Sequence, residues 1–307
     1  MGGPIQKKIL ILSDFSPAAT KALQYAQFIF KDQPTHFHIL HLYTPSIGQS
    51  RFMALGVGMK AAEDMALVNA KRGLKEQLDL AKNRVTTSLH HFTTQASFNL
   101  IVPAVKEAIG QQHYDMVVMG SKGNSGMAAS FMGSQTLRLI KAAVAVPILA
   151  IPKAVVFEFP KSIAFATDFS RFFAVSELAP LVSLAKDFKA TIQVVQVIDP
   201  QKDATEAQQF NLSMLHKYLK EIPFEAHRIS GVYRIARTLG AFSEAHGIHL
   251  MAFLNYHHKL LEDLSKEAIA KNLLKIAIAP LFILPELGIT GRYTLSKSNT
   301  RDKMYLS

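Results

Sequence analysis

The sequence predicts the α/β fold class, with two similar domains in tandem, and three observations support this. Short apolar runs such as residues 9–12 lack polar alternation, which is typical of strands buried on both faces of a sheet. Segments with helical spacing follow these runs, as expected when helices cover a parallel sheet. The chain also repeats itself, because the Asp-Phe-Ser of residues 14–16 recurs at residues 168–170 and residues 146–152 resemble residues 279–285. The period is near half the chain, so each half should form its own α/β domain.

The size and composition of the chain agree with this organisation. Its 307 residues accommodate two domains of about 150 residues each. A hydrophobic content of 49% predicts a packed, globular protein rather than a disordered one. We expect the first domain at residues 1–153, the second at residues 160–287 and a polar tail at residues 288–307.

The first half shows its expected elements in turn. The apolar strand at residues 7–12 is followed by Ser16 and Pro17, which suit the N-cap and the first turn of a helix. Residues 46–57 are expected to form a mobile loop. Apolar runs and helical spacing predict further helices at residues 18–30, 60–83, 102–112 and 135–143, and strands at residues 36–43, 90–94, 116–119 and 147–151.

The second half repeats this order of elements. Its first strand ends at Asp168, and a shorter loop at residues 199–205 stands in place of the long one. The join between the halves lies at residues 153–161. The same patterns predict helices at residues 174–188, 206–221 and 232–246, and strands at residues 163–167, 191–198, 225–229 and 280–284.

The composition excludes several classes of protein. No cysteine occurs, which excludes disulfides, thiol catalysis and cysteine-ligated zinc and fits a reducing cytosol. The N-terminus carries no secretory signal pattern, and no apolar stretch approaches the length of a membrane span, about 18 residues. The net charge of +11 is scattered rather than gathered in a basic run, so nucleic-acid binding is not expected. We therefore expect a cytoplasmic protein without a membrane segment.

A glycine-rich loop at residues 120–134 is the strongest candidate for a functional site. Gly120 ends an apolar strand, Gly123 follows after two residues, and Gly133 and Ser134 begin a helix after a further nine. Glycines let main-chain N–H groups approach an oxyanion closely, and a helix N-terminus favours negative charge. The spacing matches neither the Walker A motif nor the dinucleotide fingerprint. Alone, it describes either a plain turn or a phosphate site.

The chain resembles a tandem universal stress protein, with two copies of that domain in one polypeptide. The resemblance is carried by Asp14 at the end of the first strand, by the glycine loop with its nine-residue spacer, and by the Val-Pro-Ile-Leu strand at residues 146–149. It covers about residues 5–152 and 160–286. The resemblance implies Rossmann-like domains of the adenine nucleotide alpha hydrolase type, each a five-stranded parallel sheet with helices on both faces.

The resemblance also implies an ATP site in the first copy. Asp14 would contact the ribose or the adenine, and Leu42 would offer its main chain to the adenine. AMP and ADP are alternatives to ATP, with Mg²⁺ on the phosphates as a further option. The residues implied for the phosphates are Gly120, Gly123, Gly133 and Ser134, with Ser13 and Asn124 as additional candidates nearby.

The second half departs from the family pattern. Its stretch that corresponds to the glycine loop, residues 254–266, contains no glycine, and Glu262 and Asp263 would repel phosphates. We therefore expect the second domain to act as a structural partner. Family members pair through their last strands, so residues 145–151 and 280–284 are expected to pair antiparallel within the chain. The result would be a pseudo-dimer, and a further homodimer stays open.

Binding is a better-supported function than catalysis. The sequence shows no set of nucleophile, base and orienting group and no serine elbow. His36 and His38 alternate onto one face of a strand, but without a third ligand they are interpreted as packed or surface histidines. We expect a nucleotide-dependent stress-response or regulatory binding protein. The alternatives are a slow ATPase that uses the same pocket and a nucleotide-free interaction scaffold.

Overall fold

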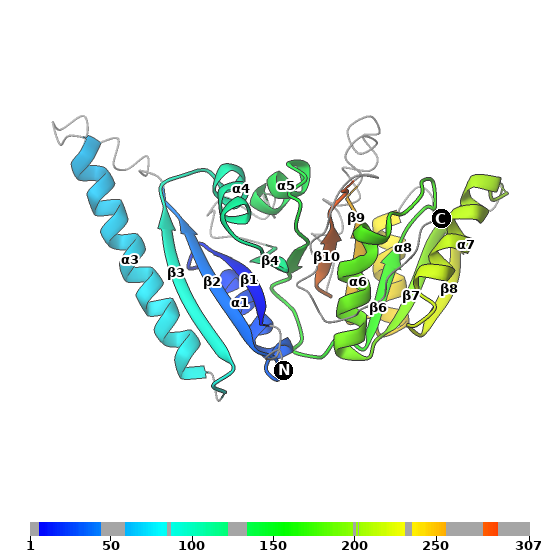
Figure 1. Ribbon diagram of the computed structural model, residues 1–307, viewed down its shortest axis with the longest axis horizontal. Helices are drawn as coiled ribbons and strands as arrows, with labels where there is room; N and C mark the ends of the chain where they lie inside the picture. Colours follow the sequence, from blue (N-terminus) through cyan, green and yellow to red (C-terminus); the bar gives the residue numbers. More distant parts are fainter. Residues whose placement is uncertain are drawn as a thin grey trace, which may run out of the picture.

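The computed structural model describes residues 6–43, 59–84, 87–121, 134–198, 201, 203–230, 235–255 and 279–287, with only the backbone described at residues 59–62 and 134. Within this part, the strands form one 10-stranded sheet in the order β3-β2-β1-β4-β5-β10-β9-β6-β7-β8. Figure 1 shows α3 at one outer end of this arrangement, α7 at the other and β10 near the middle. The predicted α/β class is confirmed.

The first half contributes the strands from β3 to β5, which are parallel to one another. The predicted N-cap of its first helix is confirmed, because the Ser16 hydroxyl accepts a hydrogen bond from the main-chain N–H of Ala19 at 3.1 Å. The elements are β1 (Lys7–Ser13), α1 (Pro17–Ile29), β2 (Thr35–Leu42), α3 (Met59–Arg84), β3 (His90–Ser97), α4 (Ile101–Gln111), β4 (Met116–Gly120), α5 (Ser134–Lys141) and β5 (Ile148–Ile151).

The second half contributes the strands from β10 to β8, again parallel to one another. Its second helix is shorter than the predicted residues 206–221, because it ends at Tyr218 and Glu221 instead pairs with Lys186 at 2.6 Å. The elements are β6 (Ser162–Ala166), α6 (Val175–Phe188), β7 (Thr191–Ile198), α7 (Glu206–Tyr218), β8 (Phe224–Ser230), α8 (Ile235–Ala245), β9 (Leu250–Leu254) and β10 (Leu281–Leu284). The predicted loop at residues 46–57, the tail and most of residues 254–266 lie outside the described residues.

The central strands are buried on both faces, as their continuous apolar runs predict. In β1, Ile9 and Ile11 pack against one face of the sheet with α1, α3, α6 and α7. Leu10 and Leu12 pack against the other face with α4, α5 and α8. Because successive side chains of a strand point to opposite faces, one short run serves both layers of helices.

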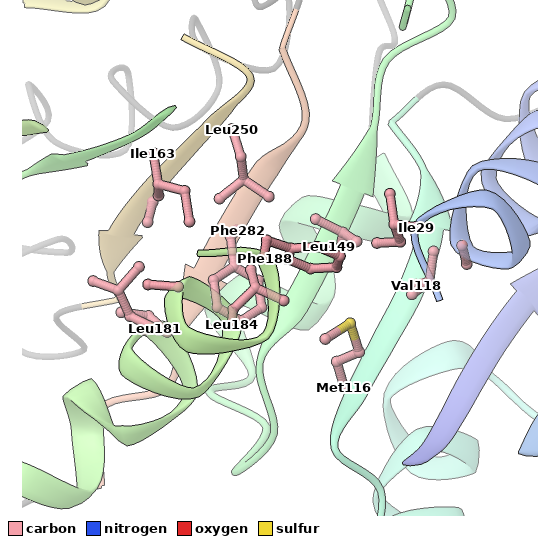
Figure 2. Close-up of a cluster of buried hydrophobic side chains, with 14 of the residues drawn as sticks. Ile29, Met116, Val118, Leu149, Ile163, Leu181, Leu184, Phe188, Leu250 and Phe282 are labelled. Carbon is pink, nitrogen blue, oxygen red and sulfur yellow. The ribbon is translucent and has the colours of Figure 1, made fainter. Parts of the chain in front are cut away.

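The two halves meet through their last strands, β5 and β10, which pair antiparallel. Leu149 and Phe282 are partners in this pair. Figure 2 shows these two side chains beside Leu184 and Phe188 of α6, in a single buried apolar cluster that draws residues from both halves. The sheet and one of its core layers therefore run without interruption across the junction.

Phe159 and Lys7 make further contacts that stabilise the junction between the halves. The ring of Phe159, in the join between them, stacks on Phe28 of α1 with centroids 4.8 Å apart and lies 6.1 Å from Phe188 of α6. The ammonium of Lys7 in β1 pairs with the carboxylate of Asp187 in α6 at 2.6 Å. Burial of aromatic area contributes more here than the partly exposed ion pair, because a surface ion pair of this kind stabilises the fold by at most about 1 kcal/mol.

Candidate functional site

The carboxyl ends of the first half's central strands define the candidate site. β1 lies between β2 and β4 and is parallel to both, so Ser13, Leu42 and Gly120 come to the same edge of the sheet. α1, which follows β1, packs on one face, whereas α5, which follows β4, packs on the other. The helices that follow these two neighbouring strands thus lie on opposite faces, which makes this a topological switch point, and open α/β sheets bind ligands at such points.

The Asp14 turn joins β1 to α1. The Ser13 hydroxyl accepts a hydrogen bond from the N–H of Phe15 at 3.1 Å, and Asp14 Oδ1 accepts one from the N–H of Ser16 at 3.0 Å. Phe15 has a φ of 60°, in the left-handed region. Ser13 is buried, whereas Asp14 is exposed at the sheet edge. The side chain of Asp14 is thus oriented by its own turn and placed where a ligand can reach it.

Close packing against α1 is one reason why residue 120 is a glycine. A Cβ at this position would lie 2.9 Å from the main-chain carbon and oxygen of Ala18, in the first turn of α1. The next N–H, that of Ser121, donates to the carbonyl of Ile151 at 2.8 Å. Glycine therefore allows the end of β4 to approach α1 closely.

Sequence reasoning missed the pair formed by Phe15 and His41 beside the Asp14 turn. Their rings stack with centroids 4.0 Å apart and planes 21° apart. His41 Nδ1 donates to the carbonyl of Ser13 at 2.8 Å, which fixes the neutral tautomer with its proton on Nδ1. Burial lowers the pKa of His41, opposed by this hydrogen bond and by the charge of Asp14. The Phe15 ring also lies against Gly73 of α3, where a Cβ would come within 2.5 Å of it.

The structure brings together half of the residues proposed for the site. Ser13, Asp14, Leu42 and Gly120 meet at one edge, and Leu42 turns its side chain to the apolar layer that contains α4, which leaves its main chain at the strand end. Ser134 begins α5. The other three, Gly123, Asn124 and Gly133, lie outside the described residues.

The same turn recurs in the second half. The Thr167 hydroxyl accepts a hydrogen bond from the N–H of Phe169 at 3.1 Å, and Asp168 Oδ1 accepts one from the N–H of Ser170 at 3.0 Å. Phe169 has a φ of 55°, close to that of Phe15. The Asp-Phe-Ser repeat in the sequence is therefore a repeat of turn geometry.

Three side chains surround this second turn, those of Leu254, Gln208 and Asn211, and we call them its rim. Leu254 pairs with Leu284 as Gly120 pairs with Ile151, so a leucine stands where the first half has its glycine. From α7, Gln208 Nε2 donates to the carbonyl of Asp168 at 2.8 Å. Asn211 Nδ2 of the same helix, which is buried, donates to the carbonyl of Phe169 at 2.9 Å. These two amides hold α7 against the turn, and the carbonyls of the turn are thereby engaged in internal hydrogen bonds.

Two of the histidines of β2 are hydrogen-bonded to neighbouring hydroxyl groups. His36 Nε2 is hydrogen-bonded to the Thr93 hydroxyl at 2.8 Å, and His38 Nδ1 to the hydroxyl of Tyr114. The described residues contain no group of three or more His, Asp or Glu side chains that would hold a metal ion. No helix among them has the length and apolar character needed to cross a bilayer.

Comparison with known proteins places the fold. Residues 6–152 match the model of the universal stress protein family. A universal stress protein from Archaeoglobus fulgidus aligns over 91% of this chain and 98% of its own, with 16% identity and a TM-score of 0.65. A putative universal stress protein from Pseudomonas aeruginosa aligns over 91% and 92%, with 14% identity and a TM-score of 0.54. At these identities the likeness concerns the fold. No curated protein matches the sequence.

Proposed function

We propose that the first half binds an adenine nucleotide, ATP or its relatives AMP and ADP, and that the chain is a tandem universal stress protein acting as a nucleotide-dependent regulatory protein in the cytoplasm. The observation that carries the proposal is the convergence of Ser13, Asp14, Leu42 and Gly120 at a switch point, within the residues that match the family model. Parallel sheets place ligands at such points because strand ends and helix N-termini gather there.

Each proposed contact follows from the chemistry of its group. The exposed carboxylate of Asp14 accepts hydrogen bonds from the ribose hydroxyls, and the main chain of Leu42 pairs with the polar edge of adenine. The glycines at 120, 123 and 133, together with Ser134 and Asn124, donate to the phosphates, on which Mg²⁺ would neutralise part of the charge. Gly120 supports this assignment because its lack of a side chain lets the end of β4 lie close to the first turn of α1.

The second half, residues 160–287, acts in this proposal as a structural partner that makes the chain a pseudo-dimer. Two observations support the role. The halves share the sheet through β5 and β10, and the second half's rim is occupied by Leu254, Gln208 and Asn211. Polar groups that are already held in internal hydrogen bonds offer little to a ligand.

A matched pair of variants tests the nucleotide contact. Asp14→Asn and Asp168→Asn each keep the side-chain oxygen that accepts from the N–H two residues on, so both turns are retained. Loss of a hydrogen bond to a charged group costs about 1.5 kcal/mol, so Asp14→Asn should weaken ATP binding about tenfold in calorimetric titration. Asp168→Asn should bind ATP as the wild type does. Equal losses in both variants, or none in either, would contradict the assignment.

A further inference from the structure

Asn255, directly after β9, stands at the same place in its half as Ser121 does after β4. Both donate their main-chain N–H to the end of the last strand, Asn255 to the carbonyl of Leu284 at 2.9 Å and Ser121 to that of Ile151 at 2.8 Å. In the first half this position leads into the glycine loop. In the second half the side chain at this position, that of Asn255, makes a hydrogen bond of its own.

The Asn255 side chain crosses the junction to the first half. Its Nδ2 donates to the main-chain carbonyl of Ile140, in the last turn of α5, at 2.5 Å. The same carbonyl accepts the N–H of Ala143 at 3.1 Å, and Ala143 has a φ of 44°, which an alanine rarely adopts. Asn255 is only 5% exposed, so water does not readily replace its amide. The end of α5 is thus fixed by a residue of the other half.

α5 connects this contact to the candidate site. The helix has 8 residues and begins at Ser134, so a change in position at its end is carried to its first turn. A helix this short is marginal without tertiary contacts. We infer that Asn255 is a positioning residue for the phosphate end of the nucleotide site, acting through α5. The inference rests on the proposed function, and it gives the second half a specific part in the affinity of the first.

The test compares Asn255→Leu with a matched control, Asn211→Leu. Both replace a buried amide that donates to a main-chain carbonyl, but Asn211 binds Phe169 within the second half and does not touch α5. Hydrogen exchange is first measured on the nucleotide-free proteins. Since a buried hydrogen bond of this kind is worth about a tenfold change in a local equilibrium, Asn255→Leu should speed exchange of the α5 amides about tenfold, and Asn211→Leu should not.

Binding of ATP and of adenosine then separates positioning from general destabilisation. Asn255→Leu should weaken ATP about fivefold and leave adenosine, which has no phosphate, unchanged. Asn211→Leu should change neither. If α5 exchange in Asn255→Leu equals that of the control, or if ATP and adenosine weaken alike, the inference is wrong although the proposed function stands. A wild-type protein that binds neither ligand overturns the proposed function and, with it, this role of Asn255.

Discussion

The two halves of the molecule share a topology and a turn but differ in the rim around that turn. Asp14 and Asp168 accept the same hydrogen bond at the same distance, 3.0 Å, and a phenylalanine follows each in the left-handed region. In the first half, however, α1 begins at Pro17 directly after the turn and packs against Gly120. In the second half, α6 begins only at Val175.

This difference shows that the Asp-Phe-Ser turn is common to both halves, whereas the residues around it are not. The Asp-Phe-Ser turn is built equally in the half with the glycine loop and in the half without it, so its geometry does not depend on that loop. Two features distinguish the halves. One is the residue at the end of the fourth strand, which is Gly120 in the first half and Leu254 in the second. The other is the pair of hydrogen bonds that Gln208 and Asn211 of α7 donate to carbonyls of the second turn. Substitutions that change these features one at a time test which of them accounts for the difference between the halves.

The largest effect is expected where the first helix of each half begins. α1 uses the Ser16 hydroxyl as its cap, whereas the buried carboxylate of Glu177 accepts from the N–H of Ala174 at 3.0 Å and pairs with Arg171 at 2.5 Å. Removing one partner of a buried pair should lower the free energy of unfolding by about 3 kcal/mol in Glu177→Ala. Ser16→Ala should cost about 1 kcal/mol. Denaturant titration measures both, and equal costs would contradict the distinction.

An intermediate effect is expected at Gly120. Gly120→Ala brings a methyl group within 2.9 Å of the Ala18 main chain, so it should lower the free energy of unfolding by about 2 kcal/mol through overpacking. The control is Gly110→Ala in α4, where an added Cβ would meet no atom within 4 Å beyond its own helix backbone and the helix should gain about 0.5 kcal/mol. A Gly120→Ala protein as stable as the wild type would show that the strand end and α1 are not in firm contact.

The smallest effect is the response to acid. Burial lowers the pKa of His38 and of His41 in β2, whereas glutamines, Gln193 and Gln196, stand at the corresponding places in β7. Because the unfolded chain keeps the ordinary histidine pKa of about 6.5, it binds protons that the folded protein does not. Stability should therefore fall as the pH drops below about 6.5. Thermal unfolding of His38→Gln and His41→Gln should show a weaker fall, and an unchanged pH dependence would contradict this.

Local patterns in the sequence predicted the elements of both halves well. The apolar run of β1, the Ser16 cap and the order of elements in both halves follow from side-chain spacing and capping chemistry, which act over a few residues. The meeting of Ser13, Leu42 and Gly120 also follows, because parallel strands end at one edge. These parts of the fold depend on local rules and on topology alone.

The antiparallel pairing of the last strands, β5 and β10, was expected and is confirmed, but the side-chain contacts between the halves could not be predicted in this way. The amide of Asn255 reaches Ile140, and Lys7 reaches Asp187, across long stretches of chain. A lone asparagine after a strand is typical of a turn, so no signal in the sequence indicates that it caps a helix of the other half. The stack of Phe15 on His41 was missed for the same reason, since Phe15 lies in the turn after β1 and His41 lies in β2.

The most direct measurement is the number of adenine nucleotides bound per chain, by native mass spectrometry during ATP titration. One intact glycine-bearing site and one rim occupied by Leu254, Gln208 and Asn211 predict one nucleotide per chain. They also predict its loss in Gly123→Val, in which a side chain would block the approach of phosphate to the main chain. Two nucleotides per chain would show that the second half's rim does not exclude a ligand. No nucleotide at saturating ATP would contradict the nucleotide site itself.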